Sequence, residues 1–312
     1  MTVVPNPVLR GFHPDPSIIQ VDGVFYVATS TFEWFPGVRI YASTDLVNWS
    51  LAAAPLDRTS QLNLWGCPDS GGIWAPCLTH DGSVFYLIYT VSLTIKLQKN
   101  THNYVVTAPR IEGPWSEPAY VNSFGFDPSF FHDEDGRKWV TTVNTDFRKN
   151  RNRFGSIVLQ EYDPVQKCSI GPVTSIFSGS SIGSTEGPHL YRIHGWYYLI
   201  TAEGGTGFGH AATVARSRDI KGPYEIMPNN PLLTSNPDSP LQRAGHADIC
   251  QTPQGDWVLV HLCGRPRHDR TMLGRETAMQ NIVFDHEGWP RLSGGGIYAR
   301  DTFTSPYDAV LP

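Results

Sequence analysis

The segment DPSII at residues 15–19, with the turn and strand DGVFYVATS at 22–30, decides the fold because its pattern returns four times. Each later copy also begins with a short motif, followed by a turn and an aromatic-rich strand. These copies open at Trp74 (WAPCL), Asp127 (DPSFF), Glu186 (EGPHL) and His246 (HADIC). Successive openings are 53 to 60 residues apart. Five copies of a unit of about four strands predict an all-β fold, a five-bladed β-propeller rather than a sandwich.

The composition supports this fold class and excludes some partners. Short runs of Val, Ile, Tyr, Phe and Thr alternate with Gly, Pro, Asp and Asn, and no amphipathic helical pattern appears. The net charge of -5 argues against a nucleic-acid partner. No apolar run approaches the roughly 18 residues of a membrane span. We place the propeller at residues 1–300 and a C-terminal tail at 301–312, a tail that could begin a linker to a further domain.

The amino terminus and the cysteines predict a cytoplasmic protein. The start, MTVVPNPVLRG, lacks the basic and apolar regions of a secretory signal. The five cysteines are odd in number and widely spread, without a C-x-x-C pair. We therefore expect reduced, mostly buried thiols.

The repeat predicts which side chains meet. Equivalent positions of propeller blades lie at equal distances from the central axis, so the five opening residues should form one ring at the mouth of the channel. This ring would contain Asp15, Trp74, Asp127, Glu186 and His246. A single Asp-Pro is more often a turn. Three acids, a Trp and a His at one repeat position instead indicate a functional site.

Three carboxylates around one pocket suit glycosidic bond hydrolysis. The reaction needs an acid that protonates the leaving oxygen and a carboxylate that activates water or attacks the sugar. Glu186 is the expected acid because its longer side chain reaches further. Asp15 is the expected base, and Asp127 the carboxylate that modulates the acid.

Metal binding is the competing use of such a ring. The acids come from separate blades, without D-x-D-x-D-G or H-E-x-x-H spacing, so we expect no catalytic metal. His246 could contact an ion or water in the channel, or hydrogen-bond a neighbouring carboxylate.

At these residues the sequence resembles glycoside hydrolase family 43, and within it the β-xylosidases with α-L-arabinofuranosidase side activity. The resemblance runs from about residue 5 to 292. It is carried in order by NPVLRGFHPDPSI, STFEWFPGVRIYASTDLVNW, GGIWAPCL, GFDPSFFHDEDGR, NRFGSIVLQEY, STEGPHLY, TAEGGTGFGHAATVARS, AGHADI and LGRETAMQ.

The resemblance implies a five-bladed propeller and an inverting mechanism with no cofactor required for the chemistry. It maps the base to Asp15, the modulating carboxylate to Asp127 and the general acid to Glu186. The matching pocket residues are Phe32, Trp74, Thr206 and Arg275, and His246 matches a residue near an axial ion, often calcium. Read without the family, Phe32 and Trp74 are also compatible with blade packing, Arg275 with a structural salt bridge and Thr206 with a turn.

The resemblance has two departures. Relatives of this type usually continue into a C-terminal β-sandwich that helps close the pocket, whereas this sequence stops at DTFTSPYDAVLP. In TTVNTDFRKN, Thr145 stands where some relatives have Trp, which removes a candidate aromatic wall.

The sequence supports an exo-hydrolase that releases xylose from the non-reducing end of β-1,4-xylo-oligosaccharides, with arabinose-substituted oligosaccharides as further substrates. The bulky TFEWFPG segment favours a closed, pocket-like site, as an exo-enzyme requires. The alternatives are an α-L-arabinofuranosidase, an endo-arabinanase, and a non-catalytic carbohydrate-binding propeller.

Overall fold

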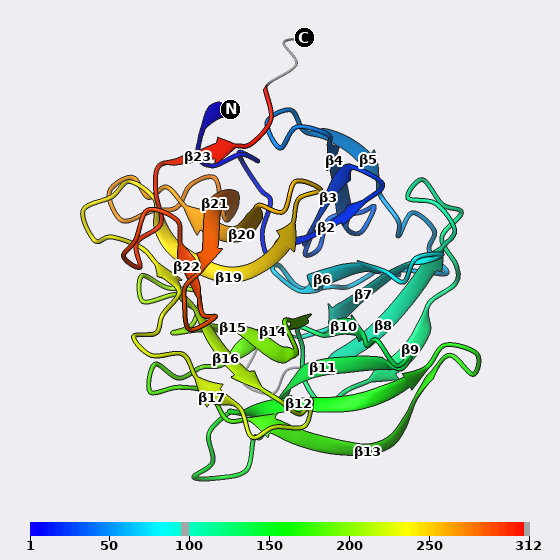
Figure 1. Cartoon of the computed structure of the whole chain (residues 1–312). Coiled ribbons are helices and arrows are strands. Elements are labelled where there is room, and N and C mark those ends of the chain that lie inside the picture. Colours follow the sequence, from blue (N-terminus) through cyan, green and yellow to red (C-terminus); the bar gives the residue numbers. More distant parts are fainter. Residues whose placement is uncertain (95–99, 309–312) are drawn as a thin grey trace.

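The computed structural model describes residues 1–94 and 100–308 and consists of β-strands joined by turns and loops. Five antiparallel sheets follow one another round a common centre in chain order (Figure 1). The predicted five-bladed β-propeller is confirmed. In four of the blades, consecutive strands are neighbours and the sheet is a simple meander; in blade four, β14 to β17 follow the same order, and β18 pairs with β16 instead of with β17.

The blades are built from the following strands. Blade one contains β2 (Ser17–Val21), β3 (Val24–Thr29), β4 (Arg39–Ser43) and β5 (Ser50–Ala53). Blade two contains β6 (Gly72–His80), β7 (Phe85–Ser92), β8 (Thr101–Ala108) and β9 (Ala119–Asn122). Blade three contains β10 (Ser129–His132), β11 (Lys138–Thr145), β12 (Phe154–Asp163) and β13 (Cys168–Phe177). Blade four contains β14 (Glu186–Ile193), β15 (Trp196–Glu203), β16 (Ala211–Ser217), β17 (Glu225–Ile226) and β18 (Leu233–Thr234). Blade five contains β19 (Gln242–Gln251), β20 (Trp257–Gly264), β21 (Glu276–Phe284) and β22 (Pro290–Leu292).

The core consists of apolar layers between neighbouring blades. The second strand of a blade is buried on both faces, and all eight residues of β7 are buried. This burial explains why the sequence there is nearly continuously apolar instead of alternating. One layer joins blades one and two, with Ile40 and Leu87 among its members, and another joins blades four and five.

The innermost strands are tied together by side chains, because they come from different sheets. Leu78 N donates to Ser17 Oγ at 3.0 Å, which joins blades one and two. Ser129 Oγ donates to the carbonyl oxygen of Pro188 at 2.5 Å, which joins blades three and four. Ile18 N donates to Asp248 Oδ2 at 2.8 Å and connects blade five back to blade one. These bonds satisfy polar groups that would otherwise be buried without partners.

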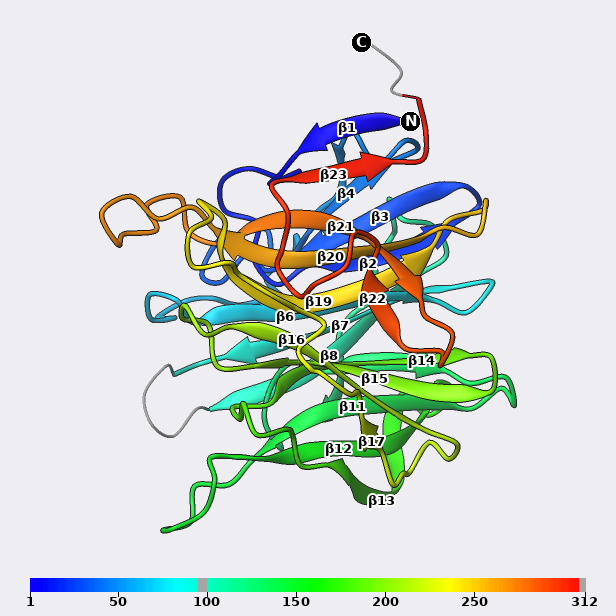
Figure 2. The same ribbon diagram turned by 60° about the vertical axis from the view of Figure 1, so that its left-hand side comes forward.

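The two ends of the chain meet beside blades five and one. Strand β1 (Thr2–Pro5) pairs with β23 (Thr302–Ser305), outside the five blades (Figure 2). Leu9 exchanges two backbone hydrogen bonds with Thr277 of β21, each 3.1 Å long. Part of the expected 301–312 tail is therefore a paired strand, and residues 309–312 lie outside the described residues.

Every innermost strand has a left-handed residue just before it or within its first five residues. The φ angles are 52° at Asp15, 37° at Ala75, 54° at Asp127, 56° at Gly187 and 51° at His246. Non-glycine residues rarely adopt this conformation. By backbone conformation, Ala75 and Gly187 are the equivalents of Asp15 and Asp127. Trp74 and Glu186 each lie one residue before that position. The expected one-to-one ring is wrong in this detail, because Ala75 and Gly187 take the left-handed position in blades two and four.

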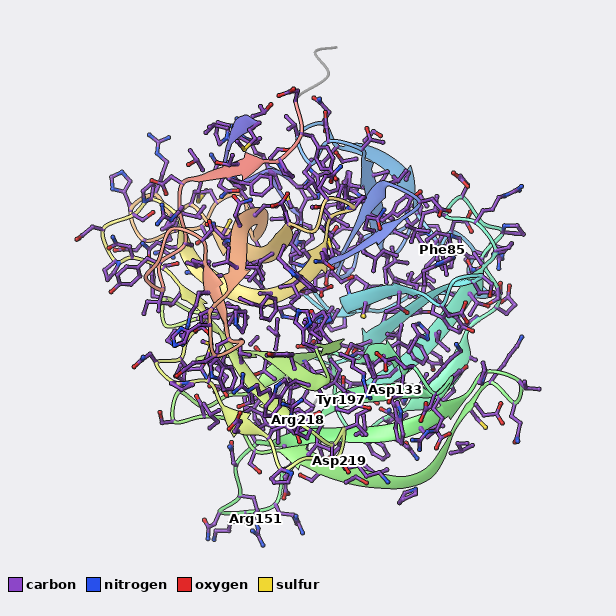
Figure 3. All side chains as sticks on the ribbon, viewed as in Figure 1. Phe85, Asp133, Arg151, Tyr197, Arg218 and Asp219 are labelled. Carbon is purple, nitrogen blue, oxygen red and sulfur yellow. The ribbon has the colours of Figure 1, made fainter. Side chains whose placement is uncertain are left out.

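Blades three and four also meet through polar side chains, of Asp133 directly after β10 and of Tyr197 in β15. Tyr197 donates from its hydroxyl to Asp133 Oδ2 at 2.8 Å, and both residues are labelled in Figure 3. Arg151, in the loop between β11 and β12, projects far from this contact (Figure 3). In Figure 2 that loop and the one between β20 and β21 reach out on the same side of the molecule.

The five cysteines are free, and three of them, Cys77, Cys250 and Cys263, are buried, as expected. Across the described part of the chain, no helix has the length and hydropathy needed to cross a bilayer.

The side chain of Asn281 provides a test of ring closure. Its amide donates to the carbonyl oxygen of Thr304 at 2.9 Å and accepts from Thr304 N at 3.0 Å, so it holds β23 against β21. We expect Asn281→Ala to lower the free energy of unfolding by about 1–3 kcal/mol, because the two strand groups lose their partner. Urea unfolding followed by tryptophan fluorescence measures this change. Gln166→Ala, at an exposed position, is the control and should leave the midpoint unchanged. An unchanged midpoint for Asn281→Ala would contradict the proposed closure.

Candidate active site

A single cavity of about 540 Å³ lies where the innermost strands begin. All the residues predicted for the site line this cavity: Asp15, Phe32, Trp74, Asp127, Glu186, Thr206, His246 and Arg275. They come from all five blades, although they are separated by up to 260 residues in the chain. The tertiary structure thus brings together the whole predicted set.

Asp15 is a buried carboxylate held from two sides. Its Oδ2 accepts a hydrogen bond of 2.7 Å from Ser30 Oγ, and its Oδ1 lies 2.6 Å from Arg275 Nη1. Burial acts to raise the pKa of Asp15, but the charge of Arg275 and these hydrogen bonds outweigh it. The pKa of Asp15 is therefore below its ordinary value, and the group is an ionised carboxylate at neutral pH.

Arg275 interacts electrostatically with all three acids. Burial acts to lower the pKa of Arg275, but attraction to Asp15, reinforced by Glu186 and Asp127, raises it above its ordinary value. Its guanidinium also lies 5.4 Å from the centre of the Phe32 ring. The sequence left open whether Arg275 binds the sugar or forms a salt bridge. In the structure it forms an ion pair with Asp15, the expected base.

The backbone holds Asp127 and Glu186 at the cavity wall. Asp127 N donates to Thr90 Oγ1 of blade two at 3.1 Å. Glu186 is the first residue of β14 and pairs with Ala202. Both carboxylates are nearly buried, with 7% and 8% of the residue exposed respectively, so each faces the cavity rather than bulk solvent.

A further acid, Glu203, positions the loop before Glu186. It is fully buried and accepts hydrogen bonds from Ser180 N at 2.8 Å and from Thr185 Oγ1 at 2.9 Å. Thr185 is the residue directly before Glu186. The sequence analysis missed Glu203, although it lies in the quoted segment TAEGGTGFGH.

Aromatic rings form one wall of the cavity. Trp74 and Phe126 meet edge to face at 5.8 Å, and Phe126 meets Phe154 at 6.2 Å. Phe126 and Phe154 were not singled out from the sequence, although Phe126 directly precedes Asp127. Phe154 pairs with Thr145 in the register of β11 and β12. It therefore supplies an aromatic ring next to Thr145, where some relatives have a Trp.

Phe32 is held in position by backbone hydrogen bonds between blades one and two. Its backbone forms two hydrogen bonds with Ile73, of 2.9 and 3.0 Å. Gly72, beside it, must be glycine because a Cβ there would lie 2.2 Å from the Phe32 carbonyl oxygen. Phe32 and Trp74 therefore line the cavity and pack against neighbouring blades at once.

His246 is buried and lines the same cavity as the acids. Burial lowers its pKa to about 4, although Asp15 nearby favours the charged form, so the ring is neutral at neutral pH. The ring packs on Gly187, where a Cβ would lie 3.0 Å from His246 Cε1. It offers one neutral nitrogen to an ion or to water.

The fit of calcium to this position is limited. Calcium takes six to eight oxygen ligands. Within residues 1–94 and 100–308, no group of three or more His, Cys, Asp or Glu side chains could hold a metal ion. Axial calcium at His246 stays a prediction that would depend on water ligands, and no step below passes through it.

Comparison with known proteins identifies the family. The model of "Glycosyl hydrolases family 43" matches residues 4–290. The chain belongs to glycosyl hydrolase family 43. This membership confirms the resemblance found in the sequence and makes the protein a glycoside hydrolase by family.

Two curated family 43 relatives are similar over nearly the whole chain. "Xylosidase/arabinosidase 43B" of Humicola insolens is 55% identical over 302 residues, which cover 95% of this chain and 56% of the relative. "Beta-xylosidase" of Bacillus subtilis (strain 168) is 52% identical over 305 residues, covering 94% and 57%. The crystal structure of xylan beta-1,4-xylosidase from Bacillus halodurans C-125 has a TM-score of 0.97 at 52% identity, covering 99% of this chain and 60% of that one. The chain thus spans little more than half the length of these relatives.

The Asp15–Arg275 pair predicts a pH effect. Because Arg275 lowers the pKa of Asp15, Arg275→Met should raise that pKa. The base would then be protonated at higher pH, so the acidic limb of the kcat/KM profile should move upward. Hydrolysis of nitrophenyl β-D-xyloside between pH 3 and 9 measures this limb, which belongs to the coupled set of carboxylates. Arg270→Met, at an exposed position, is the control. An unmoved acidic limb in Arg275→Met would show that Arg275 does not set the charge of Asp15.

Proposed function

We propose that this chain is the catalytic unit of an inverting exo-β-xylosidase, with α-L-arabinofuranosidase activity as a side activity. The observation that carries the proposal is the placement of Asp15, Asp127 and Glu186 around one cavity, with Arg275 paired to Asp15. Relatives named as β-xylosidase and as xylosidase/arabinosidase support the substrate class.

The residues divide the reaction between them. The terminal pentose packs its apolar face on the aromatic wall that includes Trp74. Asp15, kept ionised by Arg275, takes a proton from a water molecule on one face of the sugar. That water attacks the anomeric carbon while Glu186 gives its proton to the departing glycosidic oxygen. Asp127 orients Glu186 and favours its protonated state.

α-L-Arabinofuranosidase is the second candidate as the main activity. It is favoured by the name of a relative from Bacteroides ovatus, "Non-reducing end alpha-L-arabinofuranosidase BoGH43B", which is 38% identical over 305 residues. Hydrolysis rates on nitrophenyl β-D-xyloside, nitrophenyl α-L-arabinofuranoside and linear arabinan distinguish the two and also test an endo-arabinanase. A carbohydrate-binding propeller without activity would hydrolyse none of them.

Inversion predicts the stereochemistry of the first product. Water activated by Asp15 attacks opposite the leaving group, so a β-xyloside should first release α-xylose. Proton NMR of the anomeric signals during the first minutes of hydrolysis measures this. Initial release of β-xylose would mean that a carboxylate attacks the sugar directly.

Glu186 should matter most when the leaving oxygen is basic. We expect Glu186→Ala to reduce kcat/KM for xylobiose by about 100-fold or more, and to reduce it much less for an aryl xyloside with an acidic phenol. Steady-state kinetics on the two substrates measure the ratio. Glu134→Ala, on the surface, is the control. Equal losses on both substrates would show that Glu186 positions the sugar rather than protonating it.

A further inference from the structure

Two polar groups on the blade-five wall of the cavity have no partner. Arg243 and Thr271 both line the cavity. Arg243 Nε and Thr271 Oγ1 are buried, and neither has a hydrogen-bond partner within residues 1–94 and 100–308. Burying such groups without a partner is unfavourable, so native structures usually satisfy them with protein, water or ligand. Because both residues also line the cavity, they are the polar groups of this wall that a ligand could satisfy.

Arg243 differs from the other arginines nearby. Arg275 is paired with Asp15, and Arg265 binds Glu276 with two hydrogen bonds of 2.7 and 2.8 Å. The described residues place no carboxylate against Arg243. Its guanidinium instead lies over the ring of Phe208, with 5.1 Å from Cζ to the ring centre. The ring contact orients the guanidinium but leaves its N–H groups free to donate.

The backbone is distorted at Arg243. Its φ is 60°, a conformation that is costly for a long side chain, and the register of β19 with β20 shifts beside it. The flanking residues hold this conformation. Gln242 Nε2 donates to the Ser239 carbonyl oxygen at 2.6 Å, and Ala244 N donates to Ser235 Oγ at 2.9 Å. Strain that the surroundings maintain in this way is typical of functional positions.

The chemistry of the pair selects an anionic ligand. A guanidinium is always charged, only donates, and matches the two oxygens of a carboxylate. The Thr271 hydroxyl can donate to the same group. The aromatic wall of Trp74, Phe126 and Phe154 belongs to blades two and three, so it is separate from this polar wall.

We propose that Arg243 and Thr271 form a subsite for the carboxylate of a uronic-acid substituent on the oligosaccharide substrate. This inference rests on the proposed function, because it extends the same cavity to acid-substituted xylo-oligosaccharides. The subsite contributes affinity and selectivity and takes no part in bond cleavage.

The test compares the binding of D-glucuronate and D-glucose, which differ at C6 by a carboxylate in place of a hydroxymethyl group. Isothermal titration calorimetry on the 312-residue chain should give about tenfold or greater preference for glucuronate at low salt. The preference should shrink as NaCl is raised. Arg243→Met should abolish it, Arg243→Lys should retain part of it, and Thr271→Val should reduce it by a smaller factor. Arg270→Met removes an exposed charge and should leave it unchanged.

Equal affinity of the unmodified chain for glucuronate and glucose would overturn the proposal. A preference for glucuronate that survives in Arg243→Met would also overturn it. If Arg243→Met weakened the binding of glucuronate and of glucose by the same factor, Arg243 would bind neutral hydroxyl groups instead, and the proposal would be wrong. Circular dichroism checks that each variant is folded; if Arg243→Met is not, Arg243→Lys and the salt dependence decide. Hydrolysis of nitrophenyl β-D-xyloside by the same preparation reports separately on the proposed function. Activity without glucuronate preference would reject only the subsite.

Discussion

The left-handed residue that lies just before or early in every innermost strand is the constraint on which the site depends. Asp15 and Asp127 adopt this conformation themselves, and Ala75 and Gly187 adopt it directly after Trp74 and Glu186. An extended backbone would send alternate side chains into the blade packing. With the left-handed conformation, the side chain at each strand start lines the cavity. The unfavourable conformation persists because packed strands and cross-blade hydrogen bonds hold it.

The junction of blades five and one contains residues that stabilise the ring closure and residues that hold the expected catalytic base. Glu276, at the start of β21, is fully buried, binds Arg265, and accepts a hydrogen bond of 2.8 Å from Gly11 N. The neighbouring Arg275 holds Asp15. The segment that closes the ring therefore also carries the cation that keeps the base ionised. Loss of closure should disturb the base before it disturbs the aromatic wall, which belongs to blades two and three.

The cavity is divided by chemistry in a way that suits a sugar. Aromatic rings on blades two and three offer an apolar surface to the ring carbons. In the proposed function, the acids and Arg275 offer charged groups to the reacting bond. On blade five, Arg243 and Thr271 add polar atoms that remain unpartnered within the described chain. Each blade contributes different side chains to one cavity, so a repeated backbone builds an asymmetric site.

The five repeats, the all-β class and the three acids can be predicted from the sequence, because a repeat places equivalent residues round one axis. The resemblance added Phe32, Thr206 and Arg275, which the repeat alone does not single out. The pairing of Arg275 with Asp15 across 260 residues and the position of Phe154 beside Thr145 become visible only in the folded chain. The folded chain also shows that Glu203 supports the loop before Glu186 and that, among residues 1–94 and 100–308, Arg243 Nε has no hydrogen-bond partner. Such contacts depend on the paths of loops and on one-residue shifts of register. The local sequence pattern does not specify either.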